Sequence, residues 1–524
     1  MLRYMVAAIA ALLACSAASS AKPLPIRAWE FQDYNLEHMK RLVDMAAKCR
    51  INRIHLSHDI LMYAMEPVKS PTLAADINTI CDLAHSKGIK VDVWSRELAD
   101  IPAEFVKDGK IDLADPRTWA AIQDKYRKLF AACPKVDGVV ITMSEGSVAI
   151  WNDAKVSSPL SAEDRLQTLI DKVDEVCREY GKEVYCRSFA YTPGDLEVIQ
   201  KGTIRAKADV ISMPKCVPHD WQPYYPFSPE IGEVGNKRQV VEFDLGHEFT
   251  GLSTIPYINI EYMKRHLDYG ISKGICGAVF RIERMKWWAV DTPNQAVIDV
   301  ASTLLVDPSA DPYKLYRQWL ADRYPAEAVP HLYSAFIRTQ EIVEKGLFVL
   351  GDWVTNHSKV PNYGYAHGHL EEYRTAKWDP SEFWLKNEQD IHHPTLATIR
   401  RIQAEKDHAI KLANASIGDI EKAKPYLKPA DYEHLSDLFQ REKAMVVVWK
   451  AAMEVIFGID VYKADKSEPN KRFLAGAAGR LKKATDLNSK HLINMLADYT
   501  NPRPTGNADA AYGLVKEAQK VMAE

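Results

Sequence analysis

Gly138-Val-Val-Ile-Thr-Met-Ser-Glu145 is a short, mostly β-branched run that ends on a carboxylate. Two later segments have the same design. Asp209–Lys215 leads into Asp220, and Gln239–Glu248 ends on Glu248. Short apolar runs of this kind are typical of strands buried in a parallel sheet. Three strands that each deliver a carboxylate near their C-terminal end predict acid/base chemistry at one edge of that sheet.

The same kind of strand recurs from residue 24 to about residue 306, with amphipathic helical patterns between most strands. Helical spacing of apolar residues predicts helices at Leu36–Arg50, Trp119–Ala132 and Arg165–Tyr180. Eight strands that alternate with helices in about 280 residues predict a (β/α)₈ barrel, the TIM-barrel fold. The eight expected strands are Ile26–Phe31, Arg53–His58, Lys90–Leu98, Gly138–Glu145, Glu183–Ala190, Asp209–Lys215, Gln239–Glu248 and Gly277–Arg284.

The chain changes character after residue 306. The segment 216–238, rich in Pro and Tyr, is expected to be a long loop at the barrel mouth rather than a helix. Beyond 306 the strand patterns stop, which predicts a barrel domain at 22–306 and an all-helical C-terminal domain at 307–524. The long amphipathic patterns in that domain are Tyr313–Tyr324, Leu396–Lys424, Pro429–Lys463 and Arg472–Leu496.

The first 21 residues have the features of an export signal. Arg3 precedes the apolar run Met5–Ala14, and Ser19-Ser20-Ala21 fits a small-residue cleavage site. An alternative interpretation uses Leu12–Cys15 as a lipobox, with Cys15 as a lipidated N-terminus. Either interpretation predicts a periplasmic or secreted protein. No later segment is long and apolar enough to suggest a membrane span.

Composition excludes several other classes of protein. The net charge of −3 gives no basic footprint for nucleic acid. Seven cysteines follow Cys15 without tight spacing, which argues against a disulfide framework. His55, His58 and Asp59 resemble a metal site only in isolation, because no later strand offers matching ligands. We therefore expect no metal and no cofactor. A homodimer through the helical domain remains open by analogy with other helical domains.

In a barrel of this type, the catalytic groups lie where the strands end. The predicted catalytic residues are therefore Glu145, Asp220 and Glu248. Arg187 and Lys215 are expected to recognise an anionic group, as a pair of cations does. The other expected substrate contacts are Trp29, His58, Arg96, Trp221 and His247. The segment 356–369 is rich in His, Tyr and Gly, and could either cover the mouth or be an exposed connector.

Paired carboxyl groups at a barrel mouth favour glycoside hydrolysis, which needs a proton donor and a second carboxylate as base or nucleophile. Four segments resemble glycoside hydrolase family 67, the α-glucuronidases. Ser144–Gly146 resembles the family's "SEG", and Arg187–Tyr191 resembles "RAFVY". Lys215–Asp220, with the Ser228-Pro229 and Gly232 that follow, resembles "KNGPIDF…SPLFG". His247–Gly251 resembles "QEYTG".

This resemblance implies an inverting, exo-acting enzyme. Glu145 would be the general acid, Asp220 and Glu248 would activate a water, and Arg187 would bind the carboxylate of the sugar. Two departures point to a distant relative. Only a few residues separate the expected signal from the first strand, where the family has an N-terminal domain. Ile141 stands where the family has a substrate-binding lysine. A different uronic acid or a neutral α-sugar is therefore an alternative to glucuronate.

Two other hypotheses remain at this point. In a retaining barrel glycosidase, Glu145 would be the acid/base and Glu248 the nucleophile. The two carboxyl groups would then lie about 5–5.5 Å apart, rather than the about 6.5–9.5 Å of inverting enzymes. A carbohydrate-binding protein that lost catalysis is the third hypothesis, and it predicts sugar binding without hydrolysis.

Overall fold

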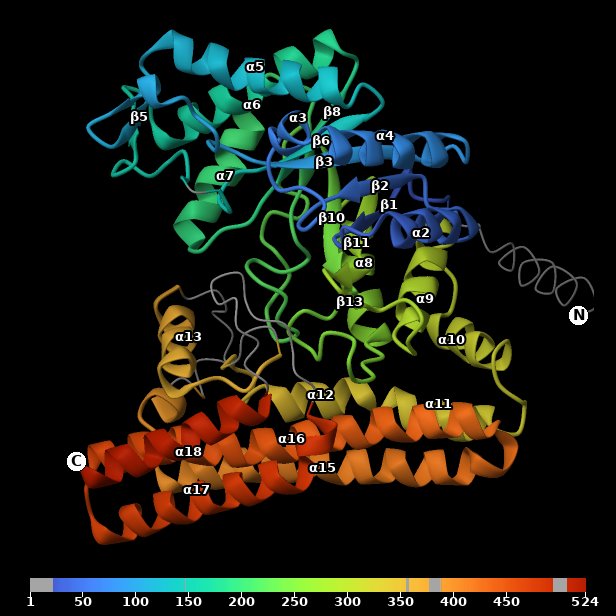
Figure 1. Ribbon diagram of the computed structural model, residues 1–524, viewed down its shortest axis with the longest axis vertical. Coiled ribbons are helices and arrows are strands. Elements are labelled where there is room, and N and C mark those ends of the chain that lie inside the picture. The colour runs from blue at the N-terminus through green and yellow to red at the C-terminus, as the bar shows by residue number, and fades with distance from the viewer. Residues whose placement is uncertain (1–21, 147, 355–357, 377–386, 388, 493–506) are drawn as a thin grey trace, which may run out of the picture.

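The computed structural model describes residues 22–146, 148–354, 358–376, 387, 389–492 and 507–524 (Figure 1). The expected export signal and Cys15 lie outside these residues. Eight parallel strands close a barrel, which confirms the predicted (β/α)₈ fold. In barrel order the strands are β1 (Ile26–Phe31), β2 (Arg53–Leu56), β3 (Lys90–Arg96), β6 (Gly138–Thr142), β8 (Glu183–Arg187), β9 (Ile211–Met213), β10 (Arg238–Asp244) and β11 (Gly277–Arg281).

Helices follow seven of the eight strands and surround the barrel. They are α2 (Leu36–Lys48), α3 (Glu66–Lys69) with α4 (Pro71–His85), α5 (Pro116–Ala132), α6 (Ala162–Glu179), α7 (Pro193–Arg205), α8 (Ile260–Ser272) and α9 (Gln295–Val306). Between β9 and β10 the chain forms no helix over residues 214–237, all of which are described. The predicted long loop is therefore present. Two small sheets lie outside the barrel sheet. One consists of β4 (Val106–Lys107), β5 (Lys110–Asp112) and β7 (Val156–Ser157), and the other consists of β12 (Glu283–Arg284) and β13 (Trp287–Trp288).

The C-terminal region is helical, as predicted. Four long helices lie side by side below the barrel in Figure 1: α15 (Leu396–Ala423), α16 (Pro429–Ala464), α17 (Glu468–Asn488) and α18 (Asn507–Ala523). The shorter helices α10 (Pro312–Ala321), α11 (Val329–Ile337) and α12 (Thr339–Leu347) connect this bundle to the barrel, and α13 (Tyr363–Ala376) lies at its side. None of the described helices is long and apolar enough to cross a membrane.

Most barrel strands end earlier than the sequence patterns suggest. β6 ends at Thr142 rather than Glu145, and β10 ends at Asp244 rather than Glu248. Three residues just beyond strand ends adopt positive φ, namely His58 at 53°, Leu98 at 56° and His247 at 61°. Residues with a Cβ seldom adopt this left-handed conformation, and it takes the backbone out of the sheet. The predicted carboxylates therefore lie on the loops that follow the strands.

The barrel interior is filled in layers. Its apolar middle consists of Ile26, Ala28, Trp94, Val140, Tyr185, Ile211, Met213, Val240 and Val279. Near the N-terminal ends of the strands, Arg53 pairs with Asp92 at 2.6 Å. Near the C-terminal ends, Arg187 pairs with Glu242 at 2.6 Å. The apolar layer thus separates a structural ion pair from the charged barrel mouth.

Closure of the barrel depends on the glycine at the start of β11. Gly277 pairs with Ile26, and a Cβ at Gly277 would lie 2.1 Å from the carbonyl oxygen of Ile26. We expect Gly277→Ala to cost about 1–3 kcal/mol because the strands must separate. Gly418→Ala is the control, since a Cβ there meets no heavy atom within 4 Å in α15. Thermal unfolding followed by circular dichroism should show a lower midpoint for the first variant only.

Candidate active site

A cavity of about 260 Å³ opens at the C-terminal ends of the barrel strands. It brings together the three predicted catalytic carboxylates and five of the seven predicted substrate contacts. Loops after six different strands contribute to its wall, so the site depends on the whole barrel. The lining residues are His58, Arg96, Glu145, Arg187, Phe189, Tyr191, Lys215, Asp220, Trp221, Glu248, Arg281 and Arg284.

Glu145 is held by two arginines at the end of β6. Its carboxylate accepts a hydrogen bond from Nη1 of Arg187 and lies 3.6 Å from Nη2 of Arg96. Burial raises the pKa of Glu145, but the positive charges of Arg187, Arg96, Lys215 and Arg281 outweigh burial and lower it to about 2. With only the protein's own charges around it, Glu145 is therefore an anion at every pH of physiological interest.

Arg187 is almost fully engaged by carboxylates. Its Nε and Nη2 bind the two oxygens of Glu242 at 2.6 and 3.2 Å, and Nη1 binds Glu145. The guanidinium carbon lies 4.5 Å from the ring centroid of Trp94, which supports it from inside the barrel. A bidentate arginine–carboxylate pair is strong and directional. Arg187 lines the cavity, and its Nε, Nη1 and Nη2 all bind carboxylates of the protein.

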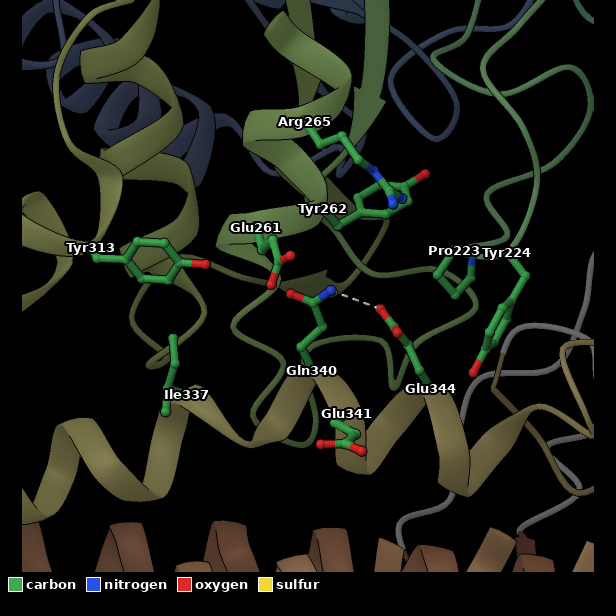
Figure 2. Close-up of a pocket in the computed structure, with 10 residues that line it drawn as sticks. All are labelled: Pro223, Tyr224, Glu261, Tyr262, Arg265, Tyr313, Ile337, Gln340, Glu341 and Glu344. Carbon is green, nitrogen blue, oxygen red and sulfur yellow. Dashed lines mark hydrogen bonds between the residues drawn. The ribbon is translucent and has the colours of Figure 1, made fainter. Parts of the chain in front are cut away.

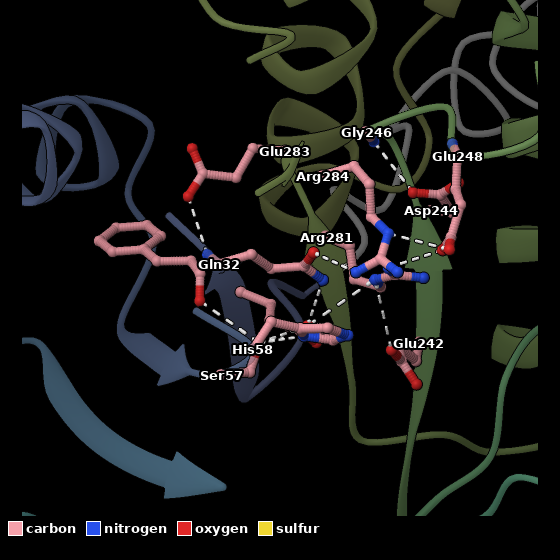
Figure 3. Close-up of polar contacts among 12 residues, drawn as sticks. Gln32, Ser57, His58, Glu242, Asp244, Gly246, Glu248, Arg281, Glu283 and Arg284 are labelled. Atoms are coloured by element: carbon pink, nitrogen blue, oxygen red, sulfur yellow. Dashed lines mark hydrogen bonds and ion pairs between the residues drawn. The ribbon is translucent and has the colours of Figure 1, made fainter. Parts of the chain in front are cut away.

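Glu248 is also held by two arginines, Arg281 and Arg284 (Figure 3). Nη2 of Arg281 and Nε of Arg284 each lie 2.9 Å from one of its oxygens. Asp244, at the end of β10, accepts the backbone N–H groups of Glu248 at 2.7 Å and Gly246 at 3.1 Å. These two hydrogen bonds fix the turn that carries Glu248. Burial raises the pKa of Asp244 to about 6.

Asp220, the third carboxylate of the cavity, forms an ion pair with Lys215. Nζ of Lys215 lies 2.7 Å from Oδ1 of Asp220. The same ammonium group lies 3.9 Å from the ring centroid of Phe189 and 4.5 Å from that of Trp221. Aromatic faces attract cations, so the two rings hold the lysine in place. This wall of the cavity therefore combines a charge pair with aromatic surface.

Close to Arg281 and Arg284 lies a group of buried polar side chains that includes Gln32, Ser57 and His58 (Figure 3). Glu30 accepts hydrogen bonds from Ser57 at 2.8 Å and Gln32 at 2.7 Å. Burial and the charge of Glu242 raise the pKa of Glu30 to about 7, although Arg281 opposes this. Burial, followed by the nearby arginines, lowers the pKa of His58 well below its usual value. His58 is thus a neutral wall of the cavity.

Two predicted substrate contacts lie elsewhere. Trp29 is fully buried between the barrel and α9, where Nε1 donates to Ser302 at 3.1 Å. Side chains alternate along a strand, and Trp29 points outward because Ala28 points into the barrel. His247 is also buried and packs edge-on against Tyr257 at 5.1 Å. Its positive φ turns it behind the loop, where burial lowers its pKa to about 3.

The segment 356–369 contacts the loop that carries Glu248 through Ser358, a residue that was not predicted to do so. Ser358 donates a hydrogen bond to the carbonyl oxygen of Glu248 at 3.1 Å and accepts one from the backbone of Gly251 at 2.7 Å. Tyr363 and His367 instead contact Asp460 on α16. The helical region therefore buttresses the loop that carries Glu248. Residues 355–357 lie outside the described residues.

Four lining residues were not among the predicted site residues: Phe189, Tyr191, Arg281 and Arg284. Arg281 and Arg284 follow the apolar run of strand eight, so the position of a charge at a strand end could have indicated them. Phe189 and Tyr191 lie within the segment quoted for the family resemblance. Tyr191 is 52% exposed at the cavity rim, where an aromatic ring is accessible to a ligand.

A larger cavity of about 440 Å³ lies beside the barrel mouth, between α8, α12 and the long loop (Figure 2). Tyr257 and Gln340 donate hydrogen bonds to its half-buried Glu344 at 3.2 and 3.0 Å. Its size does not make it the stronger candidate. The smaller cavity has carboxylates from three strand ends, which is where barrel enzymes carry their catalytic groups. In the smaller cavity, five cationic side chains outnumber three carboxylates, so this cavity attracts anions.

No protein-family model and no curated protein matches the sequence. A solved structure that shares the fold is described as a "GH138 enzyme targeting pectin rhamnogalacturonan II", with a TM-score of 0.64, 13% identity, and coverage of 95% of this chain and 67% of that one. Two further structures align with lower scores: CpGH84B, with a TM-score of 0.46 and 10% identity, and a mutant O-GlcNAc hydrolase of Thermobaculum terrenum, with 0.43 and 9%. They cover 95% and 96% of this chain, and 77% and 94% of their own chains.

The charge state of Glu145 makes a prediction about stability. Its pKa falls from 4.5 in the unfolded chain to about 2 in the fold. Ionised Glu145 therefore stabilises the fold above pH 4.5, and this stabilisation is lost as the pH falls toward 2. The shift corresponds to about 3 kcal/mol. The difference in unfolding free energy between wild type and Glu145→Gln should narrow as the pH falls from 5 to 3, as measured by denaturant titration.

Glu344→Gln provides the opposite control. Burial raises the pKa of Glu344 to about 7, so its ionisation destabilises the fold at high pH. Relative to Glu344→Gln, the wild type should gain stability as the pH falls from 7.5 to 5. If the difference in unfolding free energy between wild type and Glu145→Gln stays constant between pH 5 and 3, the arginines do not stabilise the ionised form of Glu145.

Proposed function

We propose that the protein is a glycoside hydrolase that removes a terminal, anionic, α-linked sugar from an oligosaccharide. The observation that carries this proposal is one barrel-mouth cavity that is lined by Glu145, Asp220 and Glu248 together with five cationic side chains. Two carboxyl groups on either side of a cavity are what glycoside hydrolysis needs. The fold shared with known glycoside hydrolases agrees with this chemistry.

The size of the cavity supports an exo-acting enzyme. At about 260 Å³ it lies just below the usual range for ligand sites, about 300–1,000 Å³. A single sugar ring fits such a space better than the middle of a polysaccharide chain. The half-exposed Tyr191 at the rim offers an aromatic face to the leaving part of the substrate. Acidic plant oligosaccharides are the first substrates to test, because the neighbour with the higher TM-score targets pectin.

The proposed roles follow the likeness to family 67. Glu145 protonates the leaving oxygen, while Asp220 and Glu248 hold and deprotonate a water on the other side of the sugar. Ile141, which replaces the family's lysine, is fully buried in the core outside the barrel interior. Cations from other strands surround the cavity instead, namely Arg96, Arg281 and Arg284. These cations support an anionic sugar even without a lysine at position 141.

A retaining mechanism is the alternative. The two arginines on Glu248 favour its ionised form in a fixed position, which also suits a nucleophile. Export to the periplasm or the medium is proposed from the N-terminal sequence alone.

Replacement of the proposed acid should abolish turnover. We expect Glu145→Gln to lower kcat by about 10²–10⁴-fold, the usual contribution of a general acid, on α-linked glucuronide and galacturonide oligosaccharides. Glu261→Gln is the matched control, because Glu261 lines only the larger cavity. Near-normal turnover by Glu145→Gln would remove Glu145 from the mechanism. Sugar binding without hydrolysis by the wild type would favour a binding protein.

The stereochemistry of the first product separates the two mechanisms. An inverting enzyme acting on an α-glycoside should release the β-anomer first, since water attacks the opposite face. Proton NMR of the reaction within the first minutes, before mutarotation, measures this directly. Initial release of the α-anomer would instead assign Glu248 as the nucleophile of a retaining enzyme.

A further inference from the structure

Glu145 is the proposed acid, yet its surroundings keep it ionised. An acid catalyst must carry a proton before the glycosidic bond breaks. Arg187 and Arg96 instead hold the Glu145 carboxylate as an anion. The proposed function therefore requires an event that gives this carboxyl its proton.

Arg96 supplies the geometric observation. Its Nε is buried and has no hydrogen-bond partner among the described residues. Its Nη2 lies 3.6 Å from Glu145, which is too long for a good hydrogen bond. A buried guanidinium donor without a partner is costly, and it points to an acceptor that arrives with a ligand. Arg96 lines the cavity, so a ligand in the cavity can reach it.

We propose that the carboxylate of the bound sugar takes the place of Glu145 on Arg96 and Nη1 of Arg187, and that the released Glu145 carboxyl takes up a proton from solvent. This inference rests on the proposed function. The proton then passes from Glu145 to the leaving oxygen as the glycosidic bond breaks. Water supplies the hydroxyl group of the released sugar, and its other proton passes to the Asp220 and Glu248 carboxylates, so atoms and charge balance.

The rise in the pKa of Glu145 that this proposal requires lies within the range seen for buried carboxyl groups. Each close charge shifts the pKa of a carboxyl by about 1–3 units, and buried carboxyls shift by up to about 5 units. A ligand anion at Arg96 and Arg187 brings one negative charge beside Glu145, which offsets part of the positive charge of these two arginines. Burial, already the largest influence on Glu145, then raises its pKa against weaker opposition from them.

Other charged groups face the same space and must be distinguished from Glu145. Lys215 and Arg281 also lower the pKa of Glu145, but each has a carboxylate partner of its own, Asp220 and Glu248. Arg187 also binds Glu242, which lies beneath it on β10.

Three further groups could also take up a proton when an anion binds. Glu30 and Asp244, with pKa values of about 7 and about 6, already carry protons at pH 5. His58 is the remaining competitor, because arginines also lower its pKa.

Titration calorimetry at pH 5 tests the coupling. D-glucuronate and D-galacturonate are titrated into the full-length protein in buffers of different ionisation enthalpy, which reveals the protons taken up per ligand. We expect about one proton for the wild type and for His58→Gln, and none for Glu145→Gln, which still binds. Neutral D-glucose and D-galactose should cause no uptake. Loss of uptake in His58→Gln rather than Glu145→Gln would overturn the inference.

A second variant keeps the test informative if Glu145→Gln folds poorly. Arg96→Gln should weaken uronate binding about tenfold or more, because it removes a charge-assisted hydrogen bond, and should leave neutral sugars unaffected. Unchanged uronate affinity in this variant would contradict the role of Arg96. Uronate binding without proton uptake overturns this inference alone. Failure of both uronates to bind overturns the anionic substrate as well.

Discussion

The buried pair of Arg187 and Glu242 is the interaction on which the site depends. It links β8 to β10 across the top of the barrel, with both side chains excluded from solvent. Removal of one partner from such a pair typically costs about 3–5 kcal/mol, because a charge is left buried alone. The pair also fixes the third nitrogen of Arg187 against Glu145. One interaction therefore connects the packing of two barrel strands to the position of the proposed acid.

Around this pair, each carboxylate of the cavity has its own cations. Glu145 contacts Arg187, Glu248 contacts Arg281 and Arg284, and Asp220 contacts Lys215. This arrangement orients the groups in advance of binding, which favours catalysis. For Glu145, the neighbouring arginines also lower the pKa of the carboxyl to about 2. The proposed acid must therefore gain its proton when the ligand binds.

The sequence predicted the barrel because β-branched runs and helical spacing recur with a clear period. It predicted strand ends poorly, because the loops that follow the strands decide where pairing stops. Trp29 could have been excluded from the cavity by strict alternation from Ala28, whereas His247 could not, since its positive φ breaks that alternation. Arg281 and Arg284 were not predicted, because the prediction of site residues followed the carboxylates at strand ends. Contact of Ser358 with the Glu248 loop is long-range and leaves no local pattern.

Strand register explains why residue 141 does not contribute to the proposed anion site. In β6, Val140 points into the barrel, and Ile141 packs in the core outside it. A lysine at position 141 would therefore lie among apolar side chains, where an unpaired ammonium is costly. Arg96 and Arg187 both pair in register with Thr142, so they lie at one level on either side of β6. Two neighbouring strands thus supply the cations that β6 cannot, and they do so directly beside Glu145.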